Sequence, residues 1–243
     1  MIPKIIHYCW FGRNPLPDLA LKCIASWRKY LPDYEIKEWN EDNFDVNIIP
    51  YTSEAYKARK YAFVSDYARF WIIYNYGGLY FDTDVEIIKP IDDIIERGPF
   101  MGRERVLGNN NPYIVAPGLG IGAEAHNSFY KKMLIKYEQL NFVFNKENTI
   151  NVVDITTEEF VNSGMKLDKK VQQVEGIWIY PDDYFDPRDF YSAKKMYITE
   201  NTRSIHHYAA SWIDGRTRLR NWIIGKVGPQ VTSWIRKIKH GIK

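Results

Sequence analysis

The sequence predicts an α/β domain, and three observations support this fold class. Residues 3–11, PKIIHYCWF, form an apolar run of strand length, and residues 34–39, YEIKEW, alternate polar and apolar side chains. A helix that starts near a proline is expected between them, over residues 15–30. The order strand, helix, strand is typical of nucleotide-binding sheets.

The longest predicted helix covers residues 53–76, with Ser53 as its N-cap and the double glycine that follows as its stop. A strand begins at Leu79, and another helix covers about 128–140. From there to residue 185 the pattern predicts mixed strands and loops. The chain of 243 residues is long for a single core but fits one domain of this class.

Composition and cysteine usage indicate where the protein works. Hydrophobic residues make up 45% of the chain and aromatic residues 16%, which is enough for a sizeable core. The two cysteines, Cys9 and Cys23, are too few for a disulfide framework and do not form a metal-binding motif. The first 12 residues lack the apolar core of a signal peptide. We therefore expect a cytoplasmic protein, either soluble or peripheral on the inner face of the cytoplasmic membrane.

The basic residues concentrate in a C-terminal tail. The chain has a net charge of +3, but eight of its 33 lysines and arginines and none of its 30 acids follow Gly215, which leaves −5 on residues 1–214. We predict a single domain over 1–214 and a basic amphipathic helical tail over 215–243. The tail either lies on an anionic membrane or packs on its own domain. Nucleic acid is not expected as a partner, because the remainder is acidic and shows no nucleic-acid-binding motif.

Two aspartates follow the apolar run that begins at Leu79. On one continuous strand, Tyr80, Asp82, Asp84 and Glu86 would share a face. Neighbouring carboxylates repel each other unless a cation or solvent lies between them. Ligands in open α/β sheets bind beyond the carboxyl ends of strands, and a divalent metal held by few carboxylates and by substrate phosphates fits this place. The alternative is a strand that simply ends in water.

The preceding helix carries a second charged pair. Asp66 and Arg69 fall on one stripe of this helix, beside an apolar stripe that gives the helix a reason to be buried. An ion pair at the helix surface is one interpretation. A pair that binds the hydroxyls of a sugar ligand is the other.

The run SDYARFWIIYNYGGLYFDTDVEIIKP, residues 65–90, resembles the hallmark of the DXD-containing sugar transferases of glycosyltransferase family 32. Residues 2–12 resemble the first strand of that family, and residues 179–187 and 205–212 resemble its later blocks. The resemblance covers most of residues 1–214. It implies the α/β GT-A-type nucleotide-sugar transferase fold, with a mixed central sheet flanked by helices. It also implies a nucleotide-sugar donor and Mn²⁺ or Mg²⁺ as cofactor.

The resemblance also implies roles for individual residues at the donor site. Trp10 matches the aromatic residue that stacks on the base, and backbone around Cys9 would reach the base edge. Asp66 and Arg69 match the pair that holds the donor sugar. Asp82 matches the first aspartate of the motif, which touches the ribose and the metal shell.

The metal and the diphosphate are expected to involve a second set of residues. Asp84 matches the direct metal ligand. A histidine that follows a strand supplies a further ligand in related transferases, and His206 or His207 could serve here. His206 is favoured because an apolar residue precedes it, and an ordinary half-buried histidine is the alternative. Ser211 and Trp212 would lie near the diphosphate.

The activity implied is that of a metal-dependent, retaining glycosyltransferase. Such an enzyme moves a hexose or N-acetylhexosamine to a saccharide acceptor, here in surface or capsular polysaccharide synthesis. A UDP-sugar is preferred over a GDP-sugar, because stacking on Trp10 suits a pyrimidine in the better-known relatives. A lipid-linked acceptor in the inner leaflet would be reached by an enzyme whose tail lies on that surface.

Two other classes account for part of the pattern. Phosphatases with an aspartate nucleophile also carry DxD after a strand, but their motif normally continues with threonine where this chain has Glu86. A non-catalytic sugar-nucleotide-binding module would keep the fold, yet every metal-type and sugar-type position is filled by a competent residue. On the acceptor side, the stretches NNNP (109–112) and APGLGIGA (116–123) either line the cleft or form tight turns.

Overall fold

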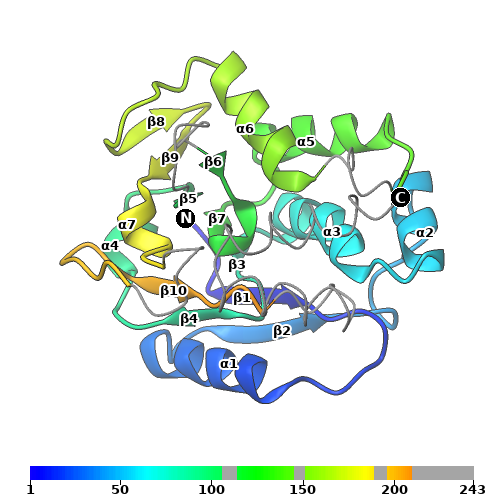
Figure 1. The fold of residues 1–243 in the computed structure, drawn as a ribbon, viewed down its shortest axis with the longest axis horizontal. Helices are drawn as coiled ribbons and strands as arrows, with labels where there is room; N and C mark the ends of the chain where they lie inside the picture. Colours follow the sequence, from blue (N-terminus) through cyan, green and yellow to red (C-terminus); the bar gives the residue numbers. More distant parts are fainter. Residues whose placement is uncertain (106–113, 145–150, 189–195, 210–243) are drawn as a thin grey trace, which may run out of the picture.

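A computed structural model describes four stretches of the chain (Figure 1), namely residues 1–105, 114–144, 151–188 and 196–209. Four predicted features lie outside the described residues: the tail 215–243, the NNNP stretch 109–112, Ser211 and Trp212. Within the described residues, no helix combines the length and the apolar character that crossing a membrane requires.

The centre of the fold is a mixed sheet with the strand order β2-β1-β3-β7-β5-β9-β8, and β6 pairs with β5. Strand β1 is parallel to β2 and β3, whereas β7 runs antiparallel between β3 and β5. The strands are β1 (Ile5–Cys9), β2 (Glu35–Trp39), β3 (Gly78–Tyr80), β5 (Phe100–Glu104), β6 (Ile114–Val115), β7 (Ile121–Ala123), β8 (Gln172–Val174) and β9 (Ile177–Tyr180).

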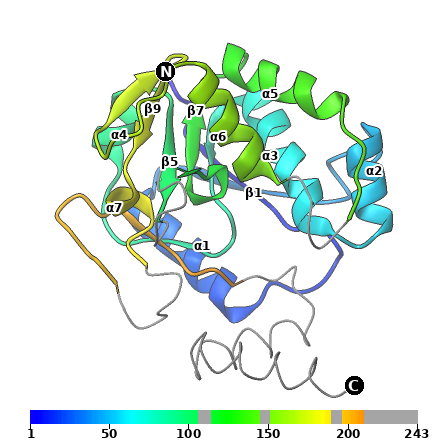
Figure 2. The same cartoon turned by 45° about the horizontal axis from the view of Figure 1, so that its top comes forward.

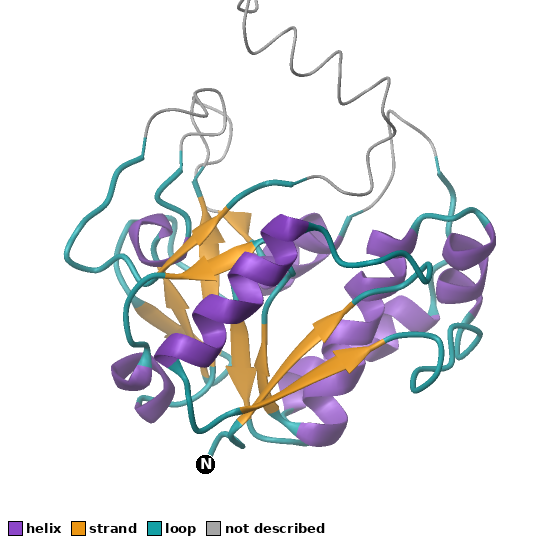
Figure 3. Cartoon of the chain, turned by 90° about the horizontal axis from the view of Figure 1, so that it is seen from below, coloured by secondary structure: helices purple, strands orange, loops and turns teal. Residues whose placement is uncertain are grey.

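Helices cover both faces of this sheet, as Figures 2 and 3 show. Residues of α2, α3, α5 and α6 share one buried apolar cluster, and residues of α1, α4 and α7 share the other. The predicted mixed sheet flanked by helices is therefore confirmed. The helices are α1 (Asp18–Tyr30), α2 (Pro50–Lys57), α3 (Tyr61–Tyr76), α4 (Asp92–Glu96), α5 (Ser128–Glu138), α6 (Val152–Asn162) and α7 (Asp182–Phe185).

The single helix predicted over 53–76 is wrong, because the chain forms two helices there. Pro50 occupies the first turn of α2, where its missing N–H costs nothing. The helix ends where Arg59 adopts a left-handed φ of 56°, and Lys60 N then donates to Ala55 O at 2.9 Å. Ser53 is inside α2 and is not its N-cap.

The continuous strand predicted from Leu79 is also wrong. Strand β3 ends at Tyr80, and the chain turns, with Val85 N donating to Asp82 O at 3.0 Å. It then forms β4 (Val85–Ile87), which pairs antiparallel with β10 (Ser204–His206) in a separate two-stranded sheet (Figure 1). The turn lets the side chain of Val85 enter the apolar cluster of α1, where Trp27 Nε1 donates to Val85 O at 2.8 Å.

Helix α6 lies in a region where we predicted only mixed strands and loops. Its first half is rich in β-branched residues, which favour strands in isolation. Its N-terminus is fixed by Asn151, whose side chain accepts a hydrogen bond from Asp154 N at 2.8 Å. Tertiary packing of Ile155 and Phe160 against the sheet outweighs the local preference.

The double glycine ends α3, as predicted, with Gly77 as the C-cap at a φ of 65°. Gly78 has a φ of +95°, and a Cβ there would lie 2.7 Å from Ile5 O on the neighbouring strand. The turn also brings Gly77 O within 3.0 Å of His7 Nε2. The other ring nitrogen of His7 accepts from Trp39 Nε1 at 3.0 Å, so the fully buried imidazole is a neutral linker between β1, β2 and the end of α3.

We predict that His7 makes the fold acid-sensitive. Burial lowers the pKa of His7 from 6.5 to about 4. Between these values the unfolded chain binds the proton and the folded chain does not, so the free energy of unfolding decreases as the pH falls. The neutral His7 contributes about 3 kcal/mol to the free energy of unfolding, fully present above pH 6.5 and lost as the pH falls towards 4. Urea unfolding of the wild type at pH 7 and pH 4.5 measures this loss. A His7→Gln variant, which cannot titrate, should lose less stability over this range, and equal losses would contradict the prediction.

Candidate active site

The centre of the candidate site is an ion pair inside helix α3. Arg69 Nη2 lies 2.8 Å from Asp66 Oδ1, and both side chains are almost fully buried. Burial raises the pKa of Asp66 to about 7, although the guanidinium of Arg69 opposes this rise. The predicted proximity of the two residues is confirmed. The pair is not a surface ion pair, because only 5% of the Arg69 side chain and 11% of the Asp66 side chain are exposed.

Arg69 also joins this helix to the aspartate motif. Its Nη2 atom lies 3.3 Å from Asp82 Oδ1, and the hydroxyl of Tyr80 donates to the same oxygen at 2.9 Å. The guanidinium therefore lies between two carboxylates, one from α3 and one from the turn after β3. Asp82 keeps 30% of its side chain exposed, so the buried cation holds a carboxylate that solvent or a ligand can reach.

Gly118 forms one wall beside the second oxygen of Asp82. It lies in the short helix η1 (Pro117–Leu119), and its carbonyl accepts from Asp82 N at 3.1 Å. A Cβ at this position would lie 2.1 Å from Asp82 Oδ2 and 3.2 Å from Arg69 Nη1. Only a glycine lets Asp82 and Arg69 keep their places. Whether residues 116–123 line a cleft stays a prediction.

Asp84 lies on the other side of the turn and has its own partners. Its Oδ1 atom lies 3.2 Å from His206 Nε2, and its Oδ2 atom accepts from Ala209 N at 2.8 Å. Burial alone would raise the pKa of Asp84, but the imidazolium of His206 and these hydrogen bonds outweigh burial and hold it low. Conversely, burial alone would lower the pKa of His206, and Asp84 raises it above its ordinary value.

The two histidines point to different carboxylates. His207 Nε2 lies 2.8 Å from Glu86 Oε2, which also pairs with Lys22 at 2.8 Å. Of the two imidazole side chains, the one that contacts an aspartate side chain of the motif is that of His206. The geometry therefore favours His206 over His207 as a metal ligand, and the ligand role itself remains a prediction.

The residues predicted to bind the base lie at the same edge of the sheet. Cys9 ends β1, which is parallel to β3, so Cys9 and the aspartate turn occupy neighbouring strand ends. Burial raises the pKa of the Cys9 thiol to about 12, so it is neutral. Trp10 follows directly and is partly exposed, with Nε1 donating to Asn14 O at 2.6 Å. The structure thus places Cys9 and Trp10 at the strand ends where a ligand is expected.

Two of the four predicted ligands, Asp84 and His206, are placed to hold a divalent metal together. Within the described part of the chain, no group of three His, Cys, Asp or Glu side chains could hold a metal by itself. The four predicted ligands do not converge, since Asp82 is turned to Arg69 and His207 to Glu86. Asp84 and His206 do converge and offer one oxygen and one nitrogen. Such a pair suits an ion that takes the rest of its shell from substrate phosphates and water.

Sequence reasoning missed three residues that build the site. Tyr80 lies two residues before Asp82, and its spacing could have indicated the contact. Gly118 was included only as part of the stretch 116–123, which was predicted to line the cleft or to form tight turns. Tyr208 was included only as part of a family block, although its hydroxyl lies 2.6 Å from Asp186 Oδ2. Long-range contacts of this kind leave no periodic signal in the sequence.

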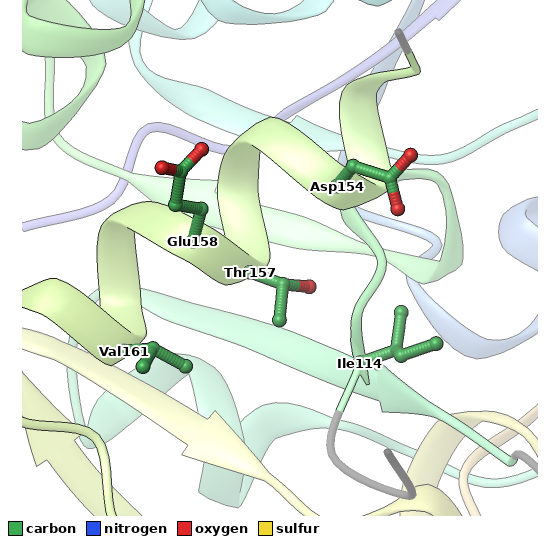
Figure 4. Close-up of a pocket in the computed structure, with 5 residues that line it drawn as sticks. All are labelled: Ile114, Asp154, Thr157, Glu158 and Val161. Carbon is green, nitrogen blue, oxygen red and sulfur yellow. The ribbon is translucent and has the colours of Figure 1, made fainter. Parts of the chain in front are cut away.

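A cavity of about 370 Å³ lies between β6 and α6, away from the aspartate turn (Figure 4). It is lined by one residue of β6 and by four residues along one side of α6: Ile114, Asp154, Thr157, Glu158 and Val161. None of them is a predicted donor-site residue. The strand pairing of Ile114 with Glu104 connects the cavity to the end of β5.

Comparison with known proteins agrees with this site. Residues 17–101 match the family model described as the glycosyltransferase sugar-binding region containing a DXD motif. The matched range includes Asp66, Arg69, Asp82 and Asp84. The predicted resemblance is therefore confirmed for this region, while membership of family 32 remains a prediction.

Curated relatives are glycosyltransferases by name. The chain is 27% identical over 127 residues to inositol phosphoceramide mannosyltransferase 1 of Schizosaccharomyces pombe, which covers 47% of this chain and 38% of that protein. It is 24% identical over 215 residues to the uncharacterized glycosyltransferase L373 of Acanthamoeba polyphaga mimivirus, with 84% and 83% covered. The chain thus spans less than half the length of the yeast relative.

A solved structure of a glycosyltransferase involved in the glycosylation of the major capsid of PBCV-1 superposes with a TM-score of 0.48 at 12% identity. The superposition covers 93% of this chain and 100% of that chain.

We predict that Arg69 is essential for the stability of this site. Arg69→Met leaves the carboxylates of Asp66 and Asp82 without their cation and should cost about 3–5 kcal/mol in the free energy of unfolding. Asp66→Asn should cost less, because Arg69 keeps its contact with Asp82. Adding Asp66→Asn to Arg69→Met should recover part of the loss, since one buried charge disappears. Urea unfolding measures all three variants, and additive losses would contradict the coupling.

Proposed function

We propose that this chain is a glycosyltransferase with a GT-A-type fold, which transfers a sugar from a nucleotide-sugar donor to a saccharide acceptor. One observation carries the proposal. Arg69 links the buried Asp66 of α3 to Asp82 of the DXD turn, beside the Asp84 and His206 pair. The match of residues 17–101 to the DXD sugar-binding family supports the same function.

The residues of the chain divide the work at this site. Trp10 stacks on the base, and Asp66 and Arg69 hold the hydroxyls of the donor sugar. Asp82 binds the ribose with the oxygen that faces Gly118. Each contact fixes the donor at the carboxyl ends of β1 and β3, where binding energy orients the bond to be broken.

Asp84 and His206 would hold Mn²⁺ or Mg²⁺ together with the diphosphate of the donor. When bound, the ion supplies Lewis-acid stabilisation of the charge on the leaving diphosphate. The protein keeps Asp84 ionised for this purpose, because the contacts from His206 and Ala209 N favour its charged form.

We further propose that the transfer retains the anomeric configuration. In such a reaction the acceptor hydroxyl attacks from the side of the leaving group, and a phosphate oxygen of the donor takes the proton. The geometry is compatible with this route, because Asp66 and Asp82 are ion-paired with Arg69 and Asp84 with His206. Among these three aspartates none is left as a free base.

The donor and the acceptor are proposed by chemical class. A UDP-sugar is our first choice of donor, in surface or capsular polysaccharide synthesis. The name of the yeast relative assigns it transfer of mannose to inositol phosphoceramide. A nucleotide-mannose should therefore be included among the donors tested, and a lipid-linked saccharide among the acceptors. The rival proposal, a sugar-nucleotide-binding module without turnover, uses the same donor contacts.

A thermal-shift panel tests the donor site. UDP, GDP and CDP are each added with and without Mn²⁺ to the wild type and to Asp84→Ala, His206→Ala and His207→Ala. One nucleotide should raise the Tm only with Mn²⁺, by roughly 5–10 °C at a hundredfold excess over its Kd. Asp84→Ala and His206→Ala should lose this shift.

His207→Ala is the matched control, because its side chain contacts Glu86 and not the aspartate motif. It should keep the metal-dependent shift. Absence of any shift in the wild type would contradict the donor site. With the nucleotide known, release of free sugar from UDP-, GDP- and CDP-sugars distinguishes the enzyme from the binding module, which would bind without turnover.

We also propose that residues 215–243 hold the protein on an anionic membrane surface close to a lipid-linked acceptor. The eight cations of this segment, with no acid among them, support the proposal. Deletion of residues 216–243 should abolish co-sedimentation with phosphatidylserine vesicles at low salt. Unchanged co-sedimentation would rule out this role of the tail.

A further inference from the structure

Residues 206–209 enclose Asp84 with three polar contacts. His206 Nε2 lies 3.2 Å from Oδ1, Ala209 N donates to Oδ2 at 2.8 Å, and His207 N donates to the backbone oxygen of Asp84 at 2.9 Å. The contacts come from residues on both sides of Tyr208. The shape of the backbone at Tyr208 therefore decides whether all three can form together.

Tyr208 adopts a left-handed backbone with a φ of 50°. This conformation is unfavourable for a residue with a large side chain and persists where the surroundings hold it in place. It reverses the chain direction, so that Ala209 N returns to the same carboxylate that His206 contacts. The strand pairing of β10 with β4 stops at His206 and so does not hold Ala209.

The side chain of Tyr208 is tied at two points, one in the main sheet and one directly after helix α7. Its hydroxyl lies 2.6 Å from Asp186 Oδ2 and 3.1 Å from Glu104 Oε1, at the end of α7 and the end of β5. Asp186 is fully buried, and its Oδ2 atom also accepts from Arg105 N at 2.8 Å. The same tyrosine ring packs on the imidazole of His206 with 4.1 Å between the centroids.

The cluster includes polar atoms that fold stability alone does not explain. Within the described residues, Asp186 Oδ1 and His206 Nδ1 are buried and have no hydrogen-bond partner. Burial of unsatisfied polar groups costs stability, and proteins retain such costs mainly at functional sites. The arrangement therefore has a positioning role beside the candidate metal ligand.

We propose that Tyr208, tethered by Asp186 and Glu104, is a positioning residue that keeps the 206–209 turn closed on Asp84. The tether fixes the imidazole of His206 and the amide of Ala209 around the carboxylate that binds the cation. The role in cation binding rests on the proposed function. The tether itself does not, and the two can be tested separately.

The first experiment measures the tether without any metal. Tyr208→Phe keeps the ring on His206 and removes the hydroxyl that contacts Asp186 and Glu104. Hydrogen exchange of the Ala209 amide, followed by NMR, should accelerate at least tenfold in this variant. Tyr8→Phe is the matched control, because its hydroxyl also donates to a carboxylate, Glu38, at 2.7 Å but lies elsewhere. It should leave Ala209 exchange unchanged, and unchanged exchange in Tyr208→Phe would overturn the proposal.

The second experiment measures Mn²⁺ binding in the presence of the nucleotide found by thermal shift. Tyr208→Phe should weaken Mn²⁺ binding about 10- to 100-fold, as loss of a group that orients a ligand does. Tyr8→Phe, the control of the first experiment, should leave Mn²⁺ binding unchanged. No loss of Mn²⁺ binding in Tyr208→Phe, or an equal loss in Tyr8→Phe, would overturn the positioning role. A wild type that binds no Mn²⁺ would overturn the proposed function, and Ala209 exchange would still decide whether Tyr208 closes the turn.

Discussion

The site depends on one buried cation, the guanidinium of Arg69. A charge in the interior is tolerated only with a partner, and Arg69 has two, Asp66 on its own helix and Asp82 on the turn after β3. Helix α3 and strand β3 must therefore keep a fixed spacing. The close approach of Gly78 to β1 and of Gly118 to Asp82 satisfies that spacing, because a Cβ at either position would collide.

The structure resolves the repulsion between the two motif aspartates by giving each its own cation. Asp82 faces Arg69 and Asp84 faces His206, and the turn between β3 and β4 directs the two side chains to different partners. One carboxylate belongs to the main sheet and the other to the small sheet of β4 and β10. A ligand that touches both would connect two layers of the fold.

How much of this site the sequence predicts depends on how far apart in the chain the contacting residues lie. The class of fold, the first strands and the pairing of Asp66 with Arg69 follow from local periodicity. The turn at Asp82 does not, because an alternating apolar pattern reads as one strand, and only the packing of Val85 against α1 reveals the break. Tyr208 reaches Glu104 across 104 positions, and no local pattern encodes such a contact.

The pairing of β4 with β10 also determines when the site around Asp84 can form during synthesis and folding. Asp84 and Ala209, which meet in the finished site, are 125 positions apart. Closing so long a segment is entropically costly and is favoured only when the intervening chain is already compact. During synthesis the DXD turn emerges early and remains without His206 until almost all of the domain has been made. A nascent chain is therefore unable to form the complete constellation before the β10 segment has been made.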